Sequence, residues 1–249
     1  MIQGFAELSV VCIEVGGSGV ETVLFAADGS HQRRAGAIAP EGRRILVAVP
    51  GLVQGIRVVG ASSLGWFDVE PLHALGIDQS ADLVLNDAEA AALGEVALRH
   101  AADVHEAVYL GLGTGVGGAV VRHDRVVGEN LFGHTPGFSD RPCLCGQTGC
   151  LETVAAGWAL PEPLDVAHRQ RLAAACAEAI RGEPLASPEL VVIAGGLARR
   201  YPDLCDHLAR HLPDRRVEPS AAPKDVKSAA AWGLRLADDL RERVAEALG

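Results

Sequence analysis

The chain has 249 residues, of which 49% are hydrophobic, 22% are charged and only 4% are aromatic. That length allows one large domain or two small ones, and the apolar fraction excludes disorder for the bulk of the chain. The net charge of −10 disfavours nucleic acid as a partner, because binding to a phosphate backbone requires a basic surface. No apolar run reaches the roughly 18–20 residues that span a bilayer, and the first residues lack the basic start of a signal peptide. We therefore expect a cytoplasmic protein with no membrane partner.

The first half of the chain predicts strands separated by tight turns. Stretches rich in β-branched and apolar residues predict strands at 8–15, 20–26, 35–38, 44–49 and 83–85. A glycine-rich turn, Gly16-Gly17-Ser18-Gly19, separates the first two strands, and Asp28-Gly29 is typical of a hairpin turn. The alanine-rich segment 88–101 carries apolar residues at three- and four-residue spacing, which predicts a helix.

The second half repeats this order from about residue 104. Strands are expected at 106–110, 119–123, 126–128 and 190–194, and helices from about Leu197 and over 226–248. A glycine-rich turn again joins the first two strands, so we interpret the chain as a duplicated architecture in which each half begins with a β-meander. Strands alternate with helices and many strands are continuous apolar runs, which indicates an α/β fold.

The segment GLGTGVGGAVV at 111–121 contains glycines in the spacing G-x-G-x-x-G. This spacing marks a dinucleotide site only where a helix follows, and here a strand follows. The backbone N–H groups of a glycine turn can still converge on a phosphate, because no Cβ blocks its approach. A plain glycine hairpin is the alternative, but five glycines in eight residues exceed what a hairpin needs. We therefore predict a phosphate-binding turn at Gly113-Thr114-Gly115.

The turn Gly16-Gly17-Ser18, which follows Glu14, is a weaker version of the same device. Alone it is typical of an ordinary turn. Two such turns in equivalent places of two halves would face each other across a cleft, as a nucleotide clamp requires, so each strengthens the interpretation of the other.

Asn86 and Asp87 end a predicted strand and begin a predicted helix. Their commonest role is that of an N-cap. The functional alternative is that Asp87 lies at the carboxyl end of a strand, where α/β proteins bind their ligands. An ionised carboxylate there can accept a proton from a substrate hydroxyl during phosphoryl transfer, and the two roles can hold at adjacent residues.

A closely spaced group of histidine and cysteine residues predicts a structural zinc site. Its members are His134, Cys143, Cys145 and Cys150. Three thiolates and one imidazole complete a tetrahedral ligand set. Three unrelated reduced cysteines are the alternative, which is disfavoured because cysteine is rare and Gly146 and Gly149 give the segment a tight, knuckle-like shape.

Taken together, these motifs resemble the ROK family of bacterial sugar kinases and sugar-responsive repressors. The matching segments are IEVGGSGVET, VAVPG, LNDAEAAALGE, GLGTGVGGAVV, FGHTPGF, CLCGQTGCLE and VVIAGG. The most specific of them is the zinc signature C-x-C-G-x-x-G-C-x-E. The resemblance implies a two-lobed actin-like, ribonuclease-H-like ATPase fold with a zinc-bound loop. The lobes are expected at 1–103 and 104–249, with the final helix able to pack back on the first lobe.

The resemblance also implies roles for individual residues, with ATP and Mg²⁺ in the cleft and a homodimeric assembly. Asp87 takes the position of the catalytic base. The sugar hydroxyls are expected to contact Ser63, Asn86, His134 and Glu152, with His134 also a zinc ligand. ATP and its Mg²⁺ are expected to contact Glu14, Gly16, Gly17, Ser18, Gly113, Thr114, Gly115, Gly195 and Gly196.

Several positions depart from the family pattern. This chain has Glu14 where the family usually has an aspartate, and Ser18 where it usually has a threonine. It has Gly19 where the family often has a lysine. Leu131 stands where the family has a sugar-binding glutamate, and Ser63 lies in a segment one residue short where an asparagine is expected. These departures predict altered metal geometry and altered sugar specificity.

Two classes of function remain open. The first is an ATP-dependent kinase that phosphorylates a hydroxyl of a sugar or sugar-like polyol. The second is a catalytically weak or inactive relative that binds its ligand as a regulatory protein. A DNA-binding repressor is disfavoured, because no helix-turn-helix pattern precedes the first strand. Retention of Asn86, Asp87 and both glycine turns favours the kinase.

Overall fold

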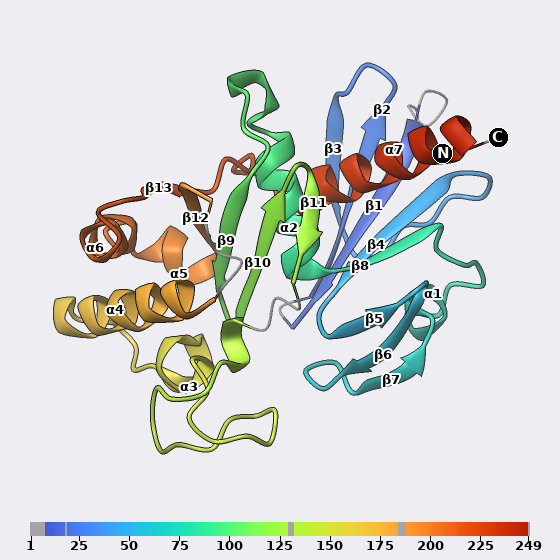
Figure 1. The fold of residues 1–249 in the computed structure, drawn as a ribbon. Helices are drawn as coiled ribbons and strands as arrows, with labels where there is room; N and C mark the ends of the chain where they lie inside the picture. The colour runs from blue at the N-terminus through green and yellow to red at the C-terminus, as the bar shows by residue number, and fades with distance from the viewer. Residues whose placement is uncertain (1–7, 18, 129–131, 184–187, 249) are drawn as a thin grey trace. The chain divides into compact units, whose positions relative to one another are not determined.

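The computed structural model describes residues 8–17, 19–128, 132–183 and 188–248, and these form two compact units (Figure 1). Unit 1 comprises Met1–Gly94 and Ala222–Gly249, and unit 2 comprises Glu95–Ala221. The division therefore falls within a helix at 94/95, whereas the sequence predicts it at 103/104. Within the described residues, no helix is both long enough and apolar enough to cross a bilayer.

Unit 1 is built on a five-stranded sheet in the order β3-β2-β1-β4-β8. Its strands are β1 (Leu8–Gly16), β2 (Gly19–Ala26), β3 (His31–Ala35), β4 (Arg44–Val49) and β8 (Leu83–Asn86). The first three form an antiparallel meander, and β4 and β8 add to β1 in parallel. Parallel strands end at the same edge of a sheet, so β1, β4 and β8 place their carboxyl ends together.

Two helices of unit 1 contact each other through glycines. They are α2 (Asp87–Ala97) and α7 (Ala230–Leu248). A Cβ at Gly94 would overlap the carbonyl oxygen of Ala229, and a Cβ at Gly233 would overlap that of Ala90. The helix α7 also packs on the first sheet, where the Trp232 ring meets the Phe25 ring edge-on at 5.3 Å. The last helix, α7, therefore belongs to unit 1.

A small antiparallel sheet covers the opposite face of unit 1, and the sequence patterns did not predict it. It contains β5 (Leu52–Gln54), β6 (Arg57–Ala61) and β7 (Trp66–Val69), followed by the short helix α1 (Pro71–Ala74). Val58 and Leu72 are fully buried against Val11, Ile13 and Val47 of the large sheet. The sheet is short and half exposed, so its apolar alternation is too brief to distinguish it from a loop.

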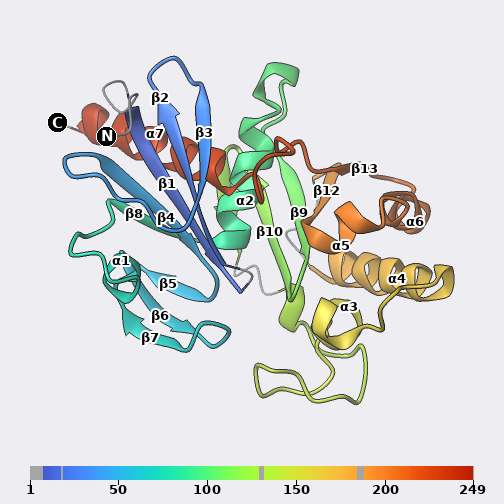
Figure 2. The ribbon, with the colours of Figure 1, turned by 180° about the vertical axis from the view of Figure 1, so that it is seen from behind.

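Unit 2 repeats the strand order of unit 1 as β11-β10-β9-β12-β13. Its strands are β9 (Ala107–Leu112), β10 (Val116–Arg122), β11 (Arg125–Val127), β12 (Leu190–Ala194) and β13 (Arg216–Pro219). The helices α4 (Val166–Gly182), α5 (Gly195–Arg200) and α6 (Leu204–His211) pack on one face of this sheet (Figure 2). The duplicated meander that the sequence predicts is confirmed.

Several predicted boundaries are wrong by a few residues, among them those of the third strand, of α2 and of the final helix. The third strand covers 31–35, because Gly36 turns the chain at φ +81° and its N–H bonds to Val20. The helix α2 ends at Ala97, and a separate 3-10 turn follows at His100–Ala102. The final helix begins at Ala230, whose N–H donates to the Ser228 hydroxyl at 3.0 Å, as an N-cap does.

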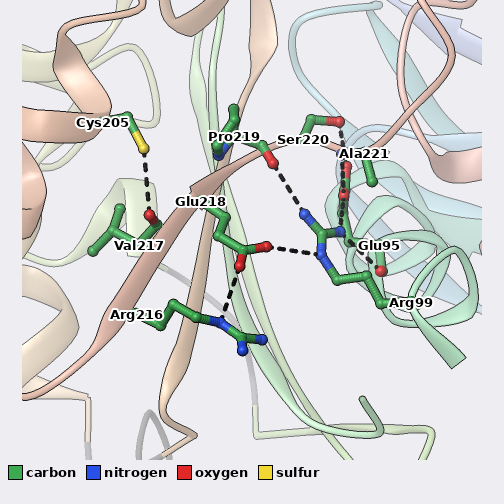
Figure 3. A network of polar contacts seen from close by, with 9 residues as sticks. All are labelled: Glu95, Arg99, Cys205, Arg216, Val217, Glu218, Pro219, Ser220 and Ala221. Carbon is green, nitrogen blue, oxygen red and sulfur yellow. Dashed lines mark hydrogen bonds and ion pairs between the residues drawn. The ribbon is translucent and has the colours of Figure 1, made fainter. Parts of the chain in front are cut away.

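A buried ionic network joins the two ends of unit 2 (Figure 3). The Glu95 carboxylate is fully buried, and it accepts from Arg99 Nη1 at 2.6 Å and from the Ala221 N–H at 2.8 Å. Ser220 contacts the same carboxylate through its hydroxyl. Arg99 also pairs with Glu218 at 3.3 Å. Within unit 2, the network fixes the end of α2 to the segment after β13.

Candidate active site

The carboxyl edge of the unit 1 sheet collects the residues that the sequence singles out in the first half. Glu14 pairs with Ala48 in parallel register, and Ala48 pairs with Leu85 on its other side. Asn86 and Asp87 follow directly after Leu85. Glu14 and Asp87 therefore lie near one another on this edge, although 73 positions separate them in the sequence numbering.

Glu14 is held by two residues from the segment that precedes α7. Its Oε2 accepts from the Ser228 hydroxyl at 2.8 Å, and its Oε1 lies 3.7 Å from Lys227 Nζ. Burial raises the pKa of the Glu14 carboxyl, while the Lys227 charge and the Ser228 hydrogen bond oppose that shift. The carboxylate is thus oriented and partly neutralised before any ligand binds.

The first glycine turn lies directly beside this ion pair. A Cβ at Gly16 would overlap Lys227 Nζ, so a larger residue there would displace the ammonium from its present position. A Cβ at Gly17 would meet no atom within 4 Å, so the backbone at Gly17 is open to an approaching group. Ser18 lies outside the described residues. The turn can accept an anionic group beside a positive charge that comes from the other end of the chain.

Asn86 has the N-cap role. Its Oδ1 accepts from the N–H groups of Ala88 at 2.9 Å and Glu89 at 3.2 Å, which lie in the first turn of α2. Its Nδ2 donates to the Gly51 carbonyl at 2.9 Å, which fixes the amide plane. Because Asn86 caps the helix, the neighbouring Asp87 is not needed as the N-cap residue.

Asp87 is a partly buried carboxylate with an altered affinity for protons. Its Oδ1 accepts from the Ala88 N–H at 2.9 Å. Burial raises the pKa of the Asp87 carboxyl, and the Ala88 hydrogen bond and the Lys227 charge offset part of that shift. A general base works best when its pKa lies closer to the working pH. The environment of Asp87 moves its pKa in that direction.

Lys227 is the residue that the sequence patterns missed. Its ammonium pairs with Glu14, and its charge also acts on Asp87. Its own N–H donates to the buried Glu21 carboxylate at 2.8 Å, which holds the segment in place. More than 200 positions separate Lys227 from Glu14 in sequence. No local spacing could have joined them, and the rarity of lysine in this chain was the only available signal.

The second glycine turn joins β9 to β10 in unit 2 and contacts the partly buried carboxylate of Glu152. Glu152, at the start of α3 (Glu152–Ala155), accepts from the Val116 N–H at 2.8 Å through Oε1. A Cβ at Gly115 would lie 2.5 Å from that oxygen, so a larger residue there would displace the Glu152 carboxylate from this position. Gly113 has open space around its Cα and gives its carbonyl to the Gly157 N–H at 2.9 Å. Thr114 lies between these two glycines at the tip of the turn.

Gly195 and Gly196 lie at the same edge of the unit 2 sheet as the second glycine turn. Strand β12 is parallel to β9 and pairs Ala194 with Gly111, so both strands end there. Gly195 has φ +92°, and a Cβ on it would overlap the Leu112 carbonyl oxygen. Gly196 is open, with no atom within 4 Å of an added Cβ. The close approach requires glycine at 195 and exposes the backbone at 196.

The four predicted zinc ligands lie together in unit 2. Their ligand atoms, from His134, Cys143, Cys145 and Cys150, are all within 4.8 Å of one another. Cys145 Sγ lies 3.7 Å from Cys150 Sγ, and Cys143 Sγ lies 3.9 Å from His134 Nδ1. A tetrahedral zinc with Zn–S bonds of about 2.3 Å separates its ligand atoms by roughly 3.8 Å. The arrangement therefore fits a zinc ion in donor chemistry, number and spacing.

The cysteine cluster lies next to the second glycine turn. Cys143 Sγ is 3.9 Å from Glu152 Oε2, the oxygen of Glu152 that does not bond to Val116. Glu152 follows Cys150 by two residues, and the Leu151 N–H donates to the Thr135 carbonyl at 2.9 Å. The loop that would bind zinc thus fixes the position of Glu152.

Two predicted specificity residues are less informative. Ser63 is exposed in the turn between β6 and β7. Leu131 lies outside the described residues. Their roles stay predictions from the sequence.

Comparisons with known proteins agree on one family. A model described as the ROK family matches residues 32–200. The N-acetylmannosamine kinase of Escherichia coli is 28% identical over 182 residues, which are 60% of this chain and 62% of that protein. The chain thus aligns with about three fifths of the length of such curated relatives. The kanosamine kinase of Amycolatopsis mediterranei is 29% identical over 223 residues, which are 76% of this chain and 72% of that protein.

Solved structures agree on the fold. A ROK family glucokinase from Streptomyces griseus, in complex with glucose and AMPPNP, matches with a TM-score of 0.70 at 18% identity. The match covers 91% of this chain and 97% of that one. A ROK family protein from Streptococcus pneumoniae, in complex with sucrose, matches with a TM-score of 0.69 at 17% identity over 95% and 99% of the two chains. At these identities the likeness establishes the α/β, actin-like fold.

Proposed function

The chain belongs to the ROK family, and we propose that it transfers the γ-phosphoryl group of ATP to a hydroxyl of a sugar or sugar-like polyol. The observation that carries the proposal is Asp87, a partly buried carboxylate with a raised pKa on the sheet edge that also bears Glu14 and the first glycine turn. The kinases of N-acetylmannosamine, glucose and kanosamine among its relatives support a sugar as the acceptor.

Asp87 acts as the general base in this proposal. It accepts the proton of the substrate hydroxyl as the hydroxyl oxygen attacks the γ-phosphorus. Asn86 fixes the peptide before Asp87 through its cap and its bond to Gly51. Because that backbone is fixed, the carboxylate needs little reorganisation to meet the hydroxyl.

Lys227 and Glu14 are the charged residues that would act on phosphate and Mg²⁺ at the same sheet edge. Lys227 reduces the repulsion between the two carboxylates and an incoming phosphate, and its ammonium lies at the glycine turn where phosphate would approach. Glu14 is the residue of this edge that would hold Mg²⁺, through a water molecule, since both of its oxygens already have partners. When bound, Mg²⁺ neutralises charge on the transferring phosphoryl group.

In unit 2, the open backbone of the second glycine turn would bind phosphate oxygens of ATP. Thr114 and Gly115 carry the N–H groups for that contact, while the Gly113 N–H donates to the Gly115 carbonyl at 3.0 Å and shapes the turn. Gly195 and Gly196 would contact the adenosine end. Gly113 and Gly196 have no atom within 4 Å of an added Cβ, which supports a close approach by a ligand. Two open glycines at one sheet edge are what a backbone-mediated nucleotide site requires.

The sugar contacts are proposed at Ser63, Asn86, His134 and Glu152. His134 and Glu152 belong to the loop that fits zinc, and bound zinc would supply rigidity to that loop. Leu131 stands where a carboxylate would bind a sugar hydroxyl, so a hydroxyl there would lose water without gaining a partner. We therefore expect glucose to be a poorer acceptor than sugars that lack or alter that hydroxyl, with amino sugars the first class to examine.

A coupled ADP-release assay tests the proposal. Hexoses, amino sugars and cyclitols are screened with ATP and Mg²⁺, and hits are checked for the phosphorylated product by mass spectrometry. The proposal predicts sugar-dependent ADP release for at least one acceptor and loss of that release in Asp87→Asn. Binding of sugars without any ADP release, in protein that is folded and zinc-replete, would contradict it.

A further inference from the structure

Two histidines and an aspartate form a second polar cluster in unit 2, away from the glycine turn. His100 lies in the 3-10 turn after α2, His105 precedes β9, and Asp124 lies in the turn between β10 and β11. All three are therefore at the amino end of β9. The glycine turn Gly113–Gly115 follows the carboxyl end of that strand, and six strand residues span about 20 Å. The cluster is thus separate from the second glycine turn of the same unit.

The geometry of the cluster brings three ligand atoms to one point. Asp124 Oδ1 is 2.9 Å from His100 Nε2, and Asp124 Oδ2 is 3.0 Å from His105 Nδ1. One ring nitrogen of each histidine and one carboxylate oxygen all lie within 4.8 Å of one another. The two imidazole rings are 5.0 Å apart between centroids.

The backbone around the cluster is fixed by hydrogen bonds. The Asp124 N–H donates to the His105 carbonyl at 3.2 Å, and the Asp103 N–H donates to the His100 carbonyl at 2.9 Å. Asp103, His123 and Asp124 all have positive φ angles, between 49° and 61°. These left-handed residues form tight turns, which turn the two histidines and the aspartate toward each other. The three ligands are therefore held close together before any ion binds.

The donor set and its exposure match the needs of a transition-metal ion. Two imidazoles and one carboxylate suit zinc and its neighbours, whereas Mg²⁺ and Ca²⁺ prefer oxygen ligands. The side chains of His100 and Asp124 are 34% and 22% exposed, so water can reach the point between them and complete the coordination. Asp103, whose carboxylate lies 3.4 Å from His105 Nε2, adds a further acidic group nearby.

We propose that His100, His105 and Asp124 bind one divalent transition-metal ion, such as Zn²⁺, at a site independent of the cysteine cluster. The ion would join the segment before β9 to the turn after β10, both of which belong to unit 2. Its role would be to stabilise this unit, because it ties together residues 24 positions apart in the chain.

Equilibrium dialysis of the full chain against micromolar Zn²⁺, followed by elemental analysis, tests the site. The wild-type chain should bind one zinc ion more than the variants His105→Gln and His100→Gln/His105→Gln. His123→Gln is the matched control, since His123 is an exposed histidine in the same turn that pairs with Glu106 instead. The control should keep the wild-type zinc count. Equal counts in wild type and in the double variant would overturn the proposal.

A cobalt titration distinguishes this site from the cysteine cluster and does not depend on counting. When Co²⁺ is added to protein that carries a single zinc ion per chain, at the cysteine cluster, the proposed site should give weak visible bands without the near-ultraviolet thiolate-to-cobalt charge transfer. Those bands should be absent from the double variant, while circular dichroism shows that the variant is folded. Charge-transfer absorption as the first change on adding Co²⁺, or no visible band at all, would contradict the proposal.

Discussion

Units 1 and 2 have the same strand order, yet they surround their glycine turns with different chemistry. In unit 1, the turn at Gly16 lies beside an ion pair between Glu14 and Lys227, which come from opposite ends of the chain. In unit 2, the turn at Gly115 lies beside Glu152, which is positioned by a nearby cysteine loop. The comparison teaches that a duplicated scaffold can support one glycine turn by a charge from a distant part of the chain and the other by a cysteine loop that is close in sequence.

The largest effect is expected from a substitution in the cysteine cluster of unit 2. Cys145→Ser should lower the zinc content by one ion per chain and the free energy of unfolding by several kcal/mol, because structural zinc binds with about 10–16 kcal/mol in small peptides. Elemental analysis and chemical denaturation measure both. Cys205→Ser, which changes a thiol outside the cluster, should leave the zinc content unchanged. An unaltered zinc content in Cys145→Ser would show that this loop does not bind the ion.

Removing the base of unit 1 should come next in size. Asp87→Asn keeps the shape of the side chain but loses the proton acceptor, so kcat should fall by about 10²–10⁴-fold. Asp78→Asn is the control, because Asp78 is an exposed aspartate in the same unit. Steady-state kinetics on the best acceptor, with a thermal melt for each variant, provide the test. Near-normal turnover in Asp87→Asn would remove Asp87 from the mechanism.

Each unit also contains a buried glutamate that pairs with an arginine, and the two pairs should differ in how much the arginine contributes to stability. Glu95 is fully buried and pairs with Arg99, which is itself 10% exposed, so Arg99→Met should cost about 3–5 kcal/mol. Glu21 pairs with Arg33, which is 47% exposed, so Arg33→Met should cost about 1 kcal/mol or less. Denaturant titrations of both variants measure the difference. Equal losses in the free energy of unfolding would mean that burial of the arginine does not determine how much each ion pair contributes to stability.

The smallest of the four effects concerns Lys227. Lys227→Met should reduce kcat/KM for ATP by roughly 10–100-fold, as expected for a contact worth about 1.5–3 kcal/mol to a charged group. The Lys227 charge lowers the pKa of Asp87, so its removal should raise that pKa further and move the acidic limb of the pH–rate profile to higher pH. Lys224→Met, at the other and exposed lysine, is the control. An acidic limb at the wild-type position would contradict the role of Lys227.

Local patterns predicted the fold well. The strands at 44–49 and 190–194 have the predicted bounds, since each is a continuous apolar run closed by proline or glycine. The zinc spacing and the glycine turns were equally local. The sheet β5-β6-β7 was missed because its strands contain three to five residues and are half exposed. These three strands are stabilised by pairing with one another, and their amino-acid composition alone does not indicate a sheet.

Contacts between distant parts of the chain were beyond the sequence patterns. Lys227 and Ser228 contact Glu14 across more than 200 positions, and Arg44 binds Asp238 with two hydrogen bonds of 2.6 Å across 194 positions. Spacing rules describe neighbours on one element and hold no information on such pairs. The homodimer and the cytoplasmic location stay predictions from the sequence.

The most direct test of the account is transfer of label from γ-³²P-ATP to an acceptor sugar by the wild-type chain and by Asp87→Asn, measured side by side. The account predicts that wild-type protein forms labelled sugar phosphate in equal amount to the ADP released, and that Asp87→Asn forms it at least about 100-fold more slowly. Release of labelled inorganic phosphate alone, or equal rates of sugar labelling in the two proteins, would contradict it.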